Sequence, residues 1–155
     1  MSLGNTQLEP NASSQTSSIS SDGRYVAFSS YAENLVSNDT NGIDDVFVYD
    51  RTTDTVEIIN VSNTGEQSNG SSLYTEPIIS SNGRYVAFSS DASNLVPNDT
   101  NGVRDVFVYD RNTHIIERVS LNNSGVEGNN QSYLLQYLLM EDLLVLLLCD
   151  KFNRF

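Results

Sequence analysis

Two polar loops carry the residue types and the spacing that could bind a metal ion. Residues 38–45 read Asn-Asp-Thr-Asn-Gly-Ile-Asp-Asp, and residues 98–105 repeat them as Asn-Asp-Thr-Asn-Gly-Val-Arg-Asp. Calcium prefers several hard oxygen ligands from a tight loop, and glycine permits the sharp bend that such a loop makes. The candidate calcium ligands are Asp39, Asn41 and Asp45 in the first copy and Asp99, Asn101 and Asp105 in the second.

The same residues also fit a purely structural role. The calcium-loop pattern to which these loops are compared is Asp-x-Asp-x-Asn-Gly-x-x-Asp. Its first position is Ser37 in one copy and Pro97 in the other, and proline offers no side-chain ligand. Asp and Asn side chains in turns accept hydrogen bonds from nearby backbone amides. An Asx-type turn between two strands is therefore the competing interpretation, and calcium is the one cofactor that the sequence suggests.

The sequence offers no set of residues for catalysis. Its single cysteine, Cys149, and its single histidine, His114, lie in different parts of the chain, so a thiol nucleophile has no evident base. Asp44 and Asp45 are adjacent, and neighbouring side chains on a strand point to opposite faces, which rules out an acid/base pair. Nucleophile-elbow, phosphate-loop and His/Cys metal motifs are missing from the sequence. We expect a non-enzymatic protein with no catalytic residues.

Charge and hydropathy exclude two classes of partner. The formal net charge is −12, from 20 acidic and 8 basic residues, and such a surface repels the phosphates of nucleic acids. The Leu-rich stretch 134–149 contains Gln136, Glu141 and Asp142 and is too short for a membrane span. Residues 1–18 are polar and lack the basic start and apolar run of a secretory signal.

The elements that position the two loops come from an internal repeat. Residues 19–51 and 79–111 are offset by 60 positions, and 27 of these 33 aligned positions are identical. Each copy predicts four strands separated by polar turns, and the dipeptides Asp22-Gly23 and Asn82-Gly83 predict tight hairpins. The predicted strands cover 18–20, 25–29, 45–49 and 55–61, and in the copy 78–80, 85–89, 105–109 and 115–121.

The middle strands of each copy are apolar on both faces. In Tyr-Val-Ala-Phe at 25–28 and Val-Phe-Val-Tyr at 46–49, large apolar residues point both ways, whereas a sheet with one wet face would alternate. Small four-stranded sheets that are covered on both faces are typical of β-propeller blades stacked around an axis. The predicted fold class is therefore all-β, with four-stranded antiparallel blades of an incomplete propeller.

The motifs Ser-Ser-Asp-Gly-Arg-Tyr-Val-Ala-Phe and Asp-Val-Phe-Val-Tyr-Asp-Arg resemble the TolB-like, WD-like propeller repeat of bacteria. The resemblance covers about residues 19–128. It implies a periplasmic, secreted or cell-surface location and a scaffold that binds proteins, peptides or sugars. The same motifs also resemble the non-catalytic propeller domains of prolyl-oligopeptidase-type hydrolases.

Repeat boundaries and blade count follow from the same alignment. We expect a polar lead-in at 1–17, repeats at 18–77 and 78–133, and an atypical Leu-rich segment at 134–155. Propellers close with about 4–8 blades, so two blades leave apolar faces exposed. The chain is accordingly expected to be a fragment of a propeller, to self-associate through those faces, or to be poorly soluble.

Three interpretations of the Leu-rich segment remain open. Its composition departs abruptly from the Asn- and Ser-rich repeats. A frameshifted third repeat is the favoured origin, a capping helix follows from the helix propensity of leucine, and a membrane segment is the weakest. We expect a short helix.

Three functions fit the sequence. The first is a non-enzymatic scaffold that binds a protein or another macromolecule. The second is the propeller portion of a larger hydrolase, and the third is a calcium-stabilised surface module.

Overall fold

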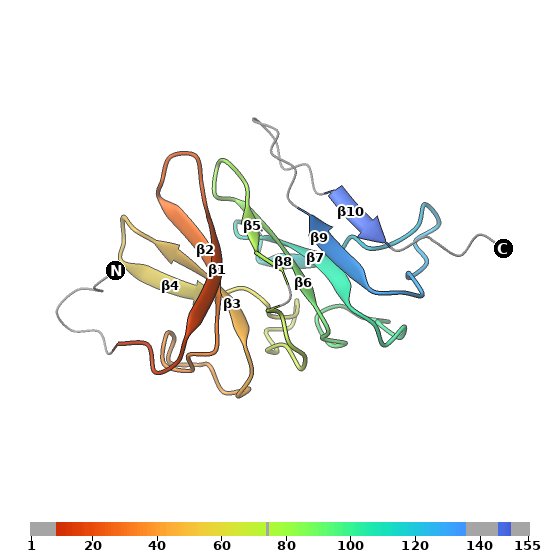
Figure 1. The fold of residues 1–155 in the computed structure, drawn as a ribbon, viewed down its shortest axis with the longest axis horizontal. Helices are drawn as coiled ribbons and strands as arrows, with labels where there is room; N and C mark the ends of the chain where they lie inside the picture. Colours follow the sequence, from red (N-terminus) through yellow and green to blue (C-terminus); the bar gives the residue numbers. More distant parts are fainter. Residues whose placement is uncertain (1–8, 74, 136–145, 150–155) are drawn as a thin grey trace.

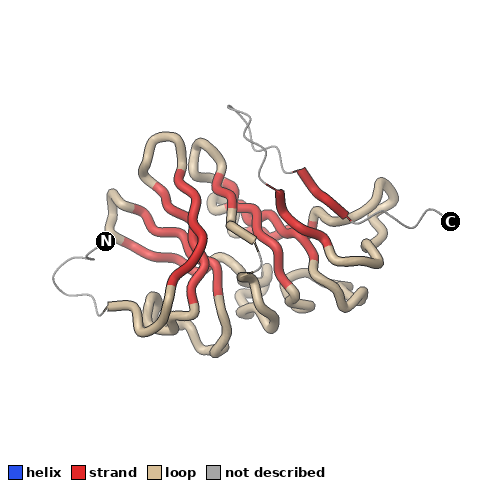
Figure 2. Tube along the Cα trace, viewed as in Figure 1, coloured by secondary structure: helices blue, strands red, loops and turns tan. Residues whose placement is uncertain are grey.

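The computed structural model describes residues 9–73, 75–135 and 146–149, and every regular element in them is a β-strand. The first sheet contains β1 to β4 and the second sheet contains β5 to β8 (Figures 1 and 2). Their bounds are β1 Ser14–Ile19, β2 Tyr25–Ser30, β3 Asp45–Asp50, β4 Thr55–Ile58, β5 Ile78–Ile79, β6 Tyr85–Ser90, β7 Asp105–Asp110 and β8 Ile115–Arg118. A separate pair is formed by β9 Ser132–Leu135 and β10 Leu146–Cys149.

Each sheet is an antiparallel meander in which strands follow one another in sequence order. The register is the same in both sheets: Tyr25 pairs with Asp50, and Tyr85 pairs with Asp110. The first hairpin turns at Gly23, whose φ of 71° is accessible to glycine at little cost. The repeated turn chemistry thus fixes the same strand pairing twice.

Several strand ends differ from the predicted ones. β1 begins at Ser14 instead of residue 18, and β5 is confined to Ile78–Ile79. The last strands end at Ile58 and Arg118 instead of residues 61 and 121. The physical reason is a side-chain substitution in the ladder: Asn60 Oδ1 accepts the amide of Val46 at 3.0 Å, and Ser120 Oγ accepts that of Val106 at 3.1 Å.

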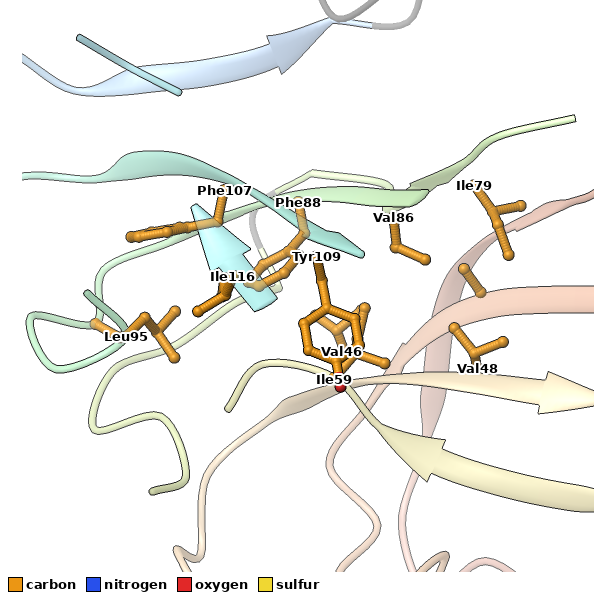
Figure 3. Close-up of a cluster of buried hydrophobic side chains, with 12 residues drawn as sticks. Val46, Val48, Ile59, Ile79, Val86, Phe88, Leu95, Phe107, Tyr109 and Ile116 are labelled. Carbon is orange, nitrogen blue, oxygen red and sulfur yellow. The ribbon is translucent and has the colours of Figure 1, made fainter. Parts of the chain in front are cut away.

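The two sheets stack face to face and share one apolar core (Figure 3). The first sheet contributes Ala27, Val46 and Val48, and Ile59 follows β4. The second sheet contributes a larger set: Ile79, Val86, Phe88, Phe107, Tyr109 and Ile116. This arrangement of stacked four-stranded antiparallel sheets confirms the predicted fold class, about two propeller-type blades.

Polar contacts at the edges align the two sheets. Asn63 accepts the amide of Ile116 at 2.8 Å and donates to its carbonyl at 3.2 Å, so the first sheet's trailing segment caps β8. Arg111 bonds to Glu57 at 2.5 Å, and its guanidinium lies 4.1 Å from the centre of the Tyr25 ring. Each contact joins a residue of the first repeat to a residue of the second, so these contacts fix how the two sheets lie relative to each other.

The expected C-terminal helix is wrong for the residues described there. Residues 132–135 and 146–149 form the antiparallel pair β9–β10, in which Leu147 pairs with Leu134. Leu134 is buried against Ala87 and Val106 on the outer face of the second sheet, and this burial outweighs the helix propensity of leucine. Residues 136–145 and 150–155 lie outside the described residues, and the frameshift origin stays a prediction.

The position of this pair along the chain matches the start of a third repeat. Moved by 120 residues, β1 and β2 would span 134–139 and 145–150, close to the observed β9 and β10. Figure 1 shows β9 beside the second sheet, on the side away from the first. Within the part of the chain that is described, no helix is long and apolar enough to cross a membrane.

We predict that Gly83→Ala destabilises the protein more than Gly23→Ala. Both glycines have a φ of 71°, so each alanine is strained by about 1–2 kcal/mol. A Cβ at Gly83 would also meet the Tyr25 ring, and this overpacking adds about 1–3 kcal/mol. Chemical denaturation of the two variants measures the difference. Equal losses would contradict the close approach of the two repeats at Tyr25.

Candidate functional site

The first loop (residues 38–45) leads into β3, and the second loop (98–105) leads into β7. Asn41 organises the first loop: its Oδ1 accepts the amide of Ile43 at 3.2 Å, and its Nδ2 donates to Asp45 at 3.0 Å and to the Ser68 carbonyl at 3.2 Å. Asn101 makes the matching contacts in the second loop. Both asparagines therefore form the Asx-type turn that was the structural alternative to calcium binding.

Two of the three carboxylates of the first loop have a buried oxygen without a hydrogen-bond partner among the described residues. Asp45 is completely buried, and its Oδ1 accepts bonds from Asn41 at 3.0 Å and from Asn60 at 2.6 Å. Its Oδ2 and the Oδ1 of Asp39 are buried and have no hydrogen-bond partner among the described residues. Burial raises the pKa of Asp45 to about 6 and also raises the pKa of Asp39. The loop thus holds two carboxylates whose negative charge is poorly compensated.

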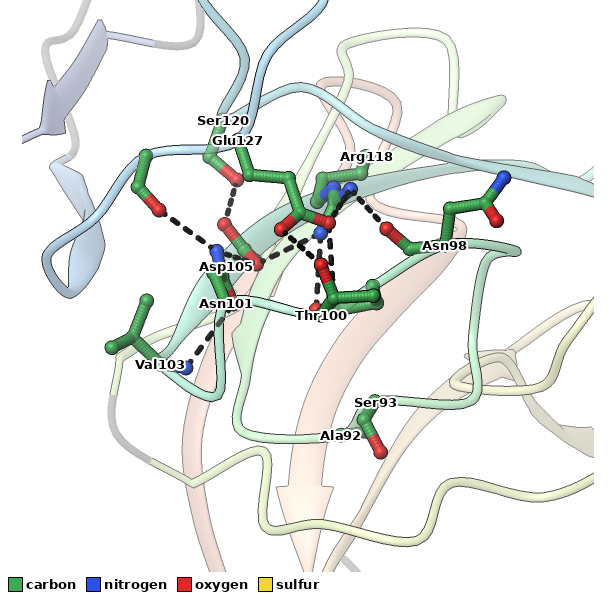
Figure 4. A network of polar contacts seen from close by, with 12 residues as sticks. Ala92, Ser93, Asn98, Thr100, Asn101, Val103, Asp105, Arg118, Ser120 and Glu127 are labelled. Atoms are coloured by element: carbon green, nitrogen blue, oxygen red, sulfur yellow. Dashed lines mark hydrogen bonds and ion pairs between the residues drawn. The ribbon is translucent and has the colours of Figure 1, made fainter.

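A cation from outside the second loop, Arg118 at the end of β8, contacts the carboxylates of that loop (Figure 4). Its Nη1 lies 3.0 Å from Asp99 and 3.2 Å from Asp105, and its Nη2 lies 2.8 Å from Glu127. Nη2 also donates to the Asn98 carbonyl at 3.3 Å. The Arg118 side chain is 7% exposed, so this is a buried ion-pair network.

The position of Arg118 is taken by Ile58 in the first repeat, and that of Glu127 is taken by Gln67 (118 − 60 and 127 − 60). Gln67 Oε1 accepts the amide and hydroxyl of Thr40 at 3.0 Å each, as Glu127 does for Thr100. Gln67 also donates to the Asn38 carbonyl at 2.9 Å. The two loops therefore share a backbone shape and differ in charge.

The two adjacent aspartates of the first loop point apart. Asp44 accepts bonds from Ser71 and Ser72, whereas Asp45 bonds to Asn41 and Asn60, in agreement with the prediction that they cannot act as a pair. Among the described residues, no three His, Cys, Asp or Glu side chains are grouped so that they could hold a metal ion. A cation in the first loop would have to rely on two carboxylates and on neutral oxygens.

Sequence reasoning missed the partners of the aspartates that end the middle strands. Asp50 accepts a bidentate pair from Arg24 at 3.0 and 2.8 Å, and Asp110 accepts one from Arg84. Arg51, which follows Asp50 directly, instead donates to the Gly23 carbonyl. The pairing depends on the β2–β3 register, in which Tyr25 lies opposite Asp50, and the sequence motifs did not predict that register.

Comparisons with known proteins give a distant likeness. No family model matches the chain, and no curated protein matches it. The chain is similar to the solved structure of TolB from Acinetobacter baumannii, with a TM-score of 0.44 and 18% identity over 79% of this chain. It spans 24% of the length of that protein. The fold assignment rests on the sheets themselves.

We predict that Arg118→Met costs about 3–5 kcal/mol of stability, because Asp99, Asp105 and Glu127 would lose their buried counter-charge. Arg24→Met is the matched control, since its side chain is 40% exposed and its ion pair is screened by solvent. Denaturant titrations compare the two losses. A loss for Arg118→Met no larger than the loss for Arg24→Met would contradict the buried network.

We also predict an acid-dependent loss of stability through Asp50 and Asp110. The bidentate arginines hold the pKa of each carboxyl well below its usual value. Because the folded-state pKa is depressed, these groups stabilise the protein above about pH 4, and the contribution is lost as the pH falls further.

The double variant Asp50→Asn, Asp110→Asn should therefore lose less stability than the parent between about pH 4 and pH 2. Glu76→Gln, at an exposed position, is the control and should leave the pH dependence unchanged. Unfolding free energies measured across this range give the comparison. Parallel pH curves for the parent and the double variant would refute the role of these pairs.

Proposed function

We propose that this chain is a non-enzymatic stack of propeller-type units that serves as a scaffold for binding a protein or another macromolecule, and that its binding surface is the open face of the first sheet. The open face is the side of β1 to β4 turned away from the second sheet. It contains a hollow of about 480 Å³. The hollow is lined by Pro10, Ser14, Gln15, Thr16, Ser17, Val26, Phe28, Leu35, Tyr49 and Val56.

The observation that carries the proposal is that the equivalent face of the second sheet is buried in the shared core. The apolar residues of the open face correspond, 60 positions later, to residues of the shared core that are all at least 97% buried. These are Val86, Phe88, Leu95, Tyr109 and Ile116. In the second sheet this surface is covered by Ala27, Val46, Val48 and Ile59 of the first sheet. The open face is thus built to be covered by a flat surface of small and branched apolar side chains.

Such a cover fits another sheet of the same kind. The hollow brings together Val26 and Phe28 of β2, Tyr49 of β3 and Val56 of β4, beside polar residues of β1. Apolar surfaces of that sort commonly mark sites of protein association. In the purified chain the available occupant is a second copy, so the open face should drive self-association. In a longer protein or a complex, the occupant would be a partner that presents a comparable sheet.

A non-enzymatic role is supported by the structural contacts that the aspartate side chains make. Asp44 bonds to Ser71 and Ser72, and Asp50 and Asp110 are bonded to arginines.

The repeat motif favours a periplasmic, secreted or cell-surface location. Fractionation of cells that express the full-length gene product tests that location directly.

The test of the binding surface is light scattering coupled to size-exclusion chromatography over a range of concentrations. We predict that the parent chain self-associates and that Val56→Lys, in the hollow, shifts it to the monomer. Val126→Lys is the control, because Val126 is 57% exposed and lies away from this face. A parent that stays monomeric at every concentration, or self-association that Val56→Lys leaves intact, would overturn the proposal.

A further inference from the structure

The guanidinium of Arg118 lies in a cradle made of four oxygen atoms. Two belong to the Asp99 and Asp105 carboxylates, one to the Glu127 carboxylate and one to the Asn98 carbonyl, at distances from 2.8 to 3.3 Å (Figure 4). Asp105 is completely buried and the Asp99 side chain is 3% exposed. A positive charge is therefore an integral part of the second loop.

The first repeat keeps the oxygens of this cradle and lacks the cation. Each cradle residue has an oxygen-bearing counterpart 60 positions earlier: Asn38, Asp39, Asp45 and Gln67. Ile58 replaces Arg118, and an isoleucine side chain supplies no charge.

In the first loop, where no arginine is present, two buried carboxylate oxygens lack a hydrogen-bond donor among the described residues. Asp45 is fully buried, yet its Oδ2 has no donor among the described residues, and neither has the buried Oδ1 of Asp39. One oxygen of Asp99 also lacks a donor, but the other oxygen of that carboxylate contacts Arg118. Buried carboxylate oxygens without a partner are costly, so the first loop needs a compensating ligand.

We propose that the first loop binds one divalent cation of the calcium type between the carboxylates of Asp39 and Asp45, and that the guanidinium of Arg118 replaces this cation in the second loop. Two carboxylates neutralise a doubly charged ion. In the second loop the three carboxylates of Asp99, Asp105 and Glu127 share the single positive charge of Arg118.

The donor set favours calcium over magnesium. Calcium takes 6–8 oxygens at about 2.3–2.6 Å in irregular geometry and accepts backbone carbonyls, amide oxygens and water. The neutral oxygens on offer are the Asn38 carbonyl, which accepts a hydrogen bond from Gln67 Nε2, and Gln67 Oε1, which accepts one from the Thr40 amide. They are the counterparts of the Asn98 and Glu127 oxygens that contact Arg118 in the second loop. Magnesium demands a near-ideal octahedron, which loop oxygens of this variety do not readily supply.

The cation site is independent of the open face. Residues 38–45 and Gln67 do not line the hollow on the first sheet. Three of the four oxygen-bearing residues belong to the loop that leads into β3, and the fourth, Gln67, follows β4. Failure of the binding-surface proposal would therefore leave this inference standing, and the reverse also holds.

The first test is a calcium titration of the full chain, followed by amide chemical shifts in NMR spectra. We expect a Kd of about 10⁻⁴ to 10⁻³ M, typical of extracellular calcium modules, and shifts concentrated at 38–45 and Gln67. Residues 98–105 should keep their shifts. Magnesium at the same concentrations is the ion control and should bind at least about tenfold more weakly. Absence of any calcium-dependent shift, or equal shifts in both loops, would overturn the proposal.

Single variants separate a site from a general charge effect. Asp39→Asn should weaken calcium binding by about tenfold or more, because it removes one of the two anionic ligands. Glu117→Gln removes an equal charge from an exposed position on β8 and should leave the Kd unchanged. Equal effects of the two variants would show a diffuse ion atmosphere in place of a site.

Reciprocal exchanges give the sharpest test. We expect calcium to raise the melting temperature of the parent chain. The double variant Ile58→Arg, Gln67→Glu copies the second loop into the first and should abolish that rise. The double variant Arg118→Ile, Glu127→Gln copies the first loop into the second and should add calcium-dependent shifts at 98–105. If either exchange fails to fold, Asp39→Asn decides the matter. Calcium stabilisation that persists in the Ile58→Arg, Gln67→Glu protein would contradict the proposal.

Discussion

The structure depends on one constraint: its small sheets are apolar on both faces and must be covered on both. The strands β2, β3, β6 and β7 carry large apolar residues at successive positions, so no orientation of a sheet leaves a polar face to solvent. A sheet of four short strands cannot bury such residues by itself. Stacking is therefore the source of stability, and the shared core between the first and second sheets is its centre.

This constraint explains features that look unrelated along the chain. The β9 strand places Leu134 against Ala87 and Val106, so that the outer face of the second sheet is covered in part. The opposite end of the stack keeps the hollow around Phe28. The polar edge contacts of Asn63 and Arg111 fix the relative position of the two sheets. The loops that lead into β3 and β7 lie outside the stack, which leaves them free to differ in charge.

Most of the architecture followed from sequence because it repeats. The 60-residue offset, the Asp-Gly and Asn-Gly turns and the apolar middle strands predicted both meanders. The strand ends were harder to predict, since Asn60 and Ser120 replace backbone groups in the ladder with their side chains. The helix expected for the Leu-rich segment failed where residues are described, because tertiary burial of Leu134 outweighed local propensity.

In the candidate site, too, the features that depend on local spacing were predicted from the sequence, and those that depend on distant residues were not. The sequence located the loops and the turn role of Asn41 and Asn101, which depend on local spacing. It did not show the cradle around Arg118, because that residue approaches from another strand, 13 positions beyond Asp105. A comparison of the two repeats at Ile58 and Arg118 would have revealed the difference in charge. The calcium ligands themselves stay a prediction.

Residue-resolved hydrogen exchange of the native chain tests the central claim most directly, namely that the sheets are stable because they stack. If stacking holds the sheets, the slowest amides of β2, β3, β6 and β7 exchange through one common opening, with a single free energy for both sheets. If the first sheet opened at a much lower free energy while the second kept its full protection, the sheets would be independent, and stacking could not be what holds them.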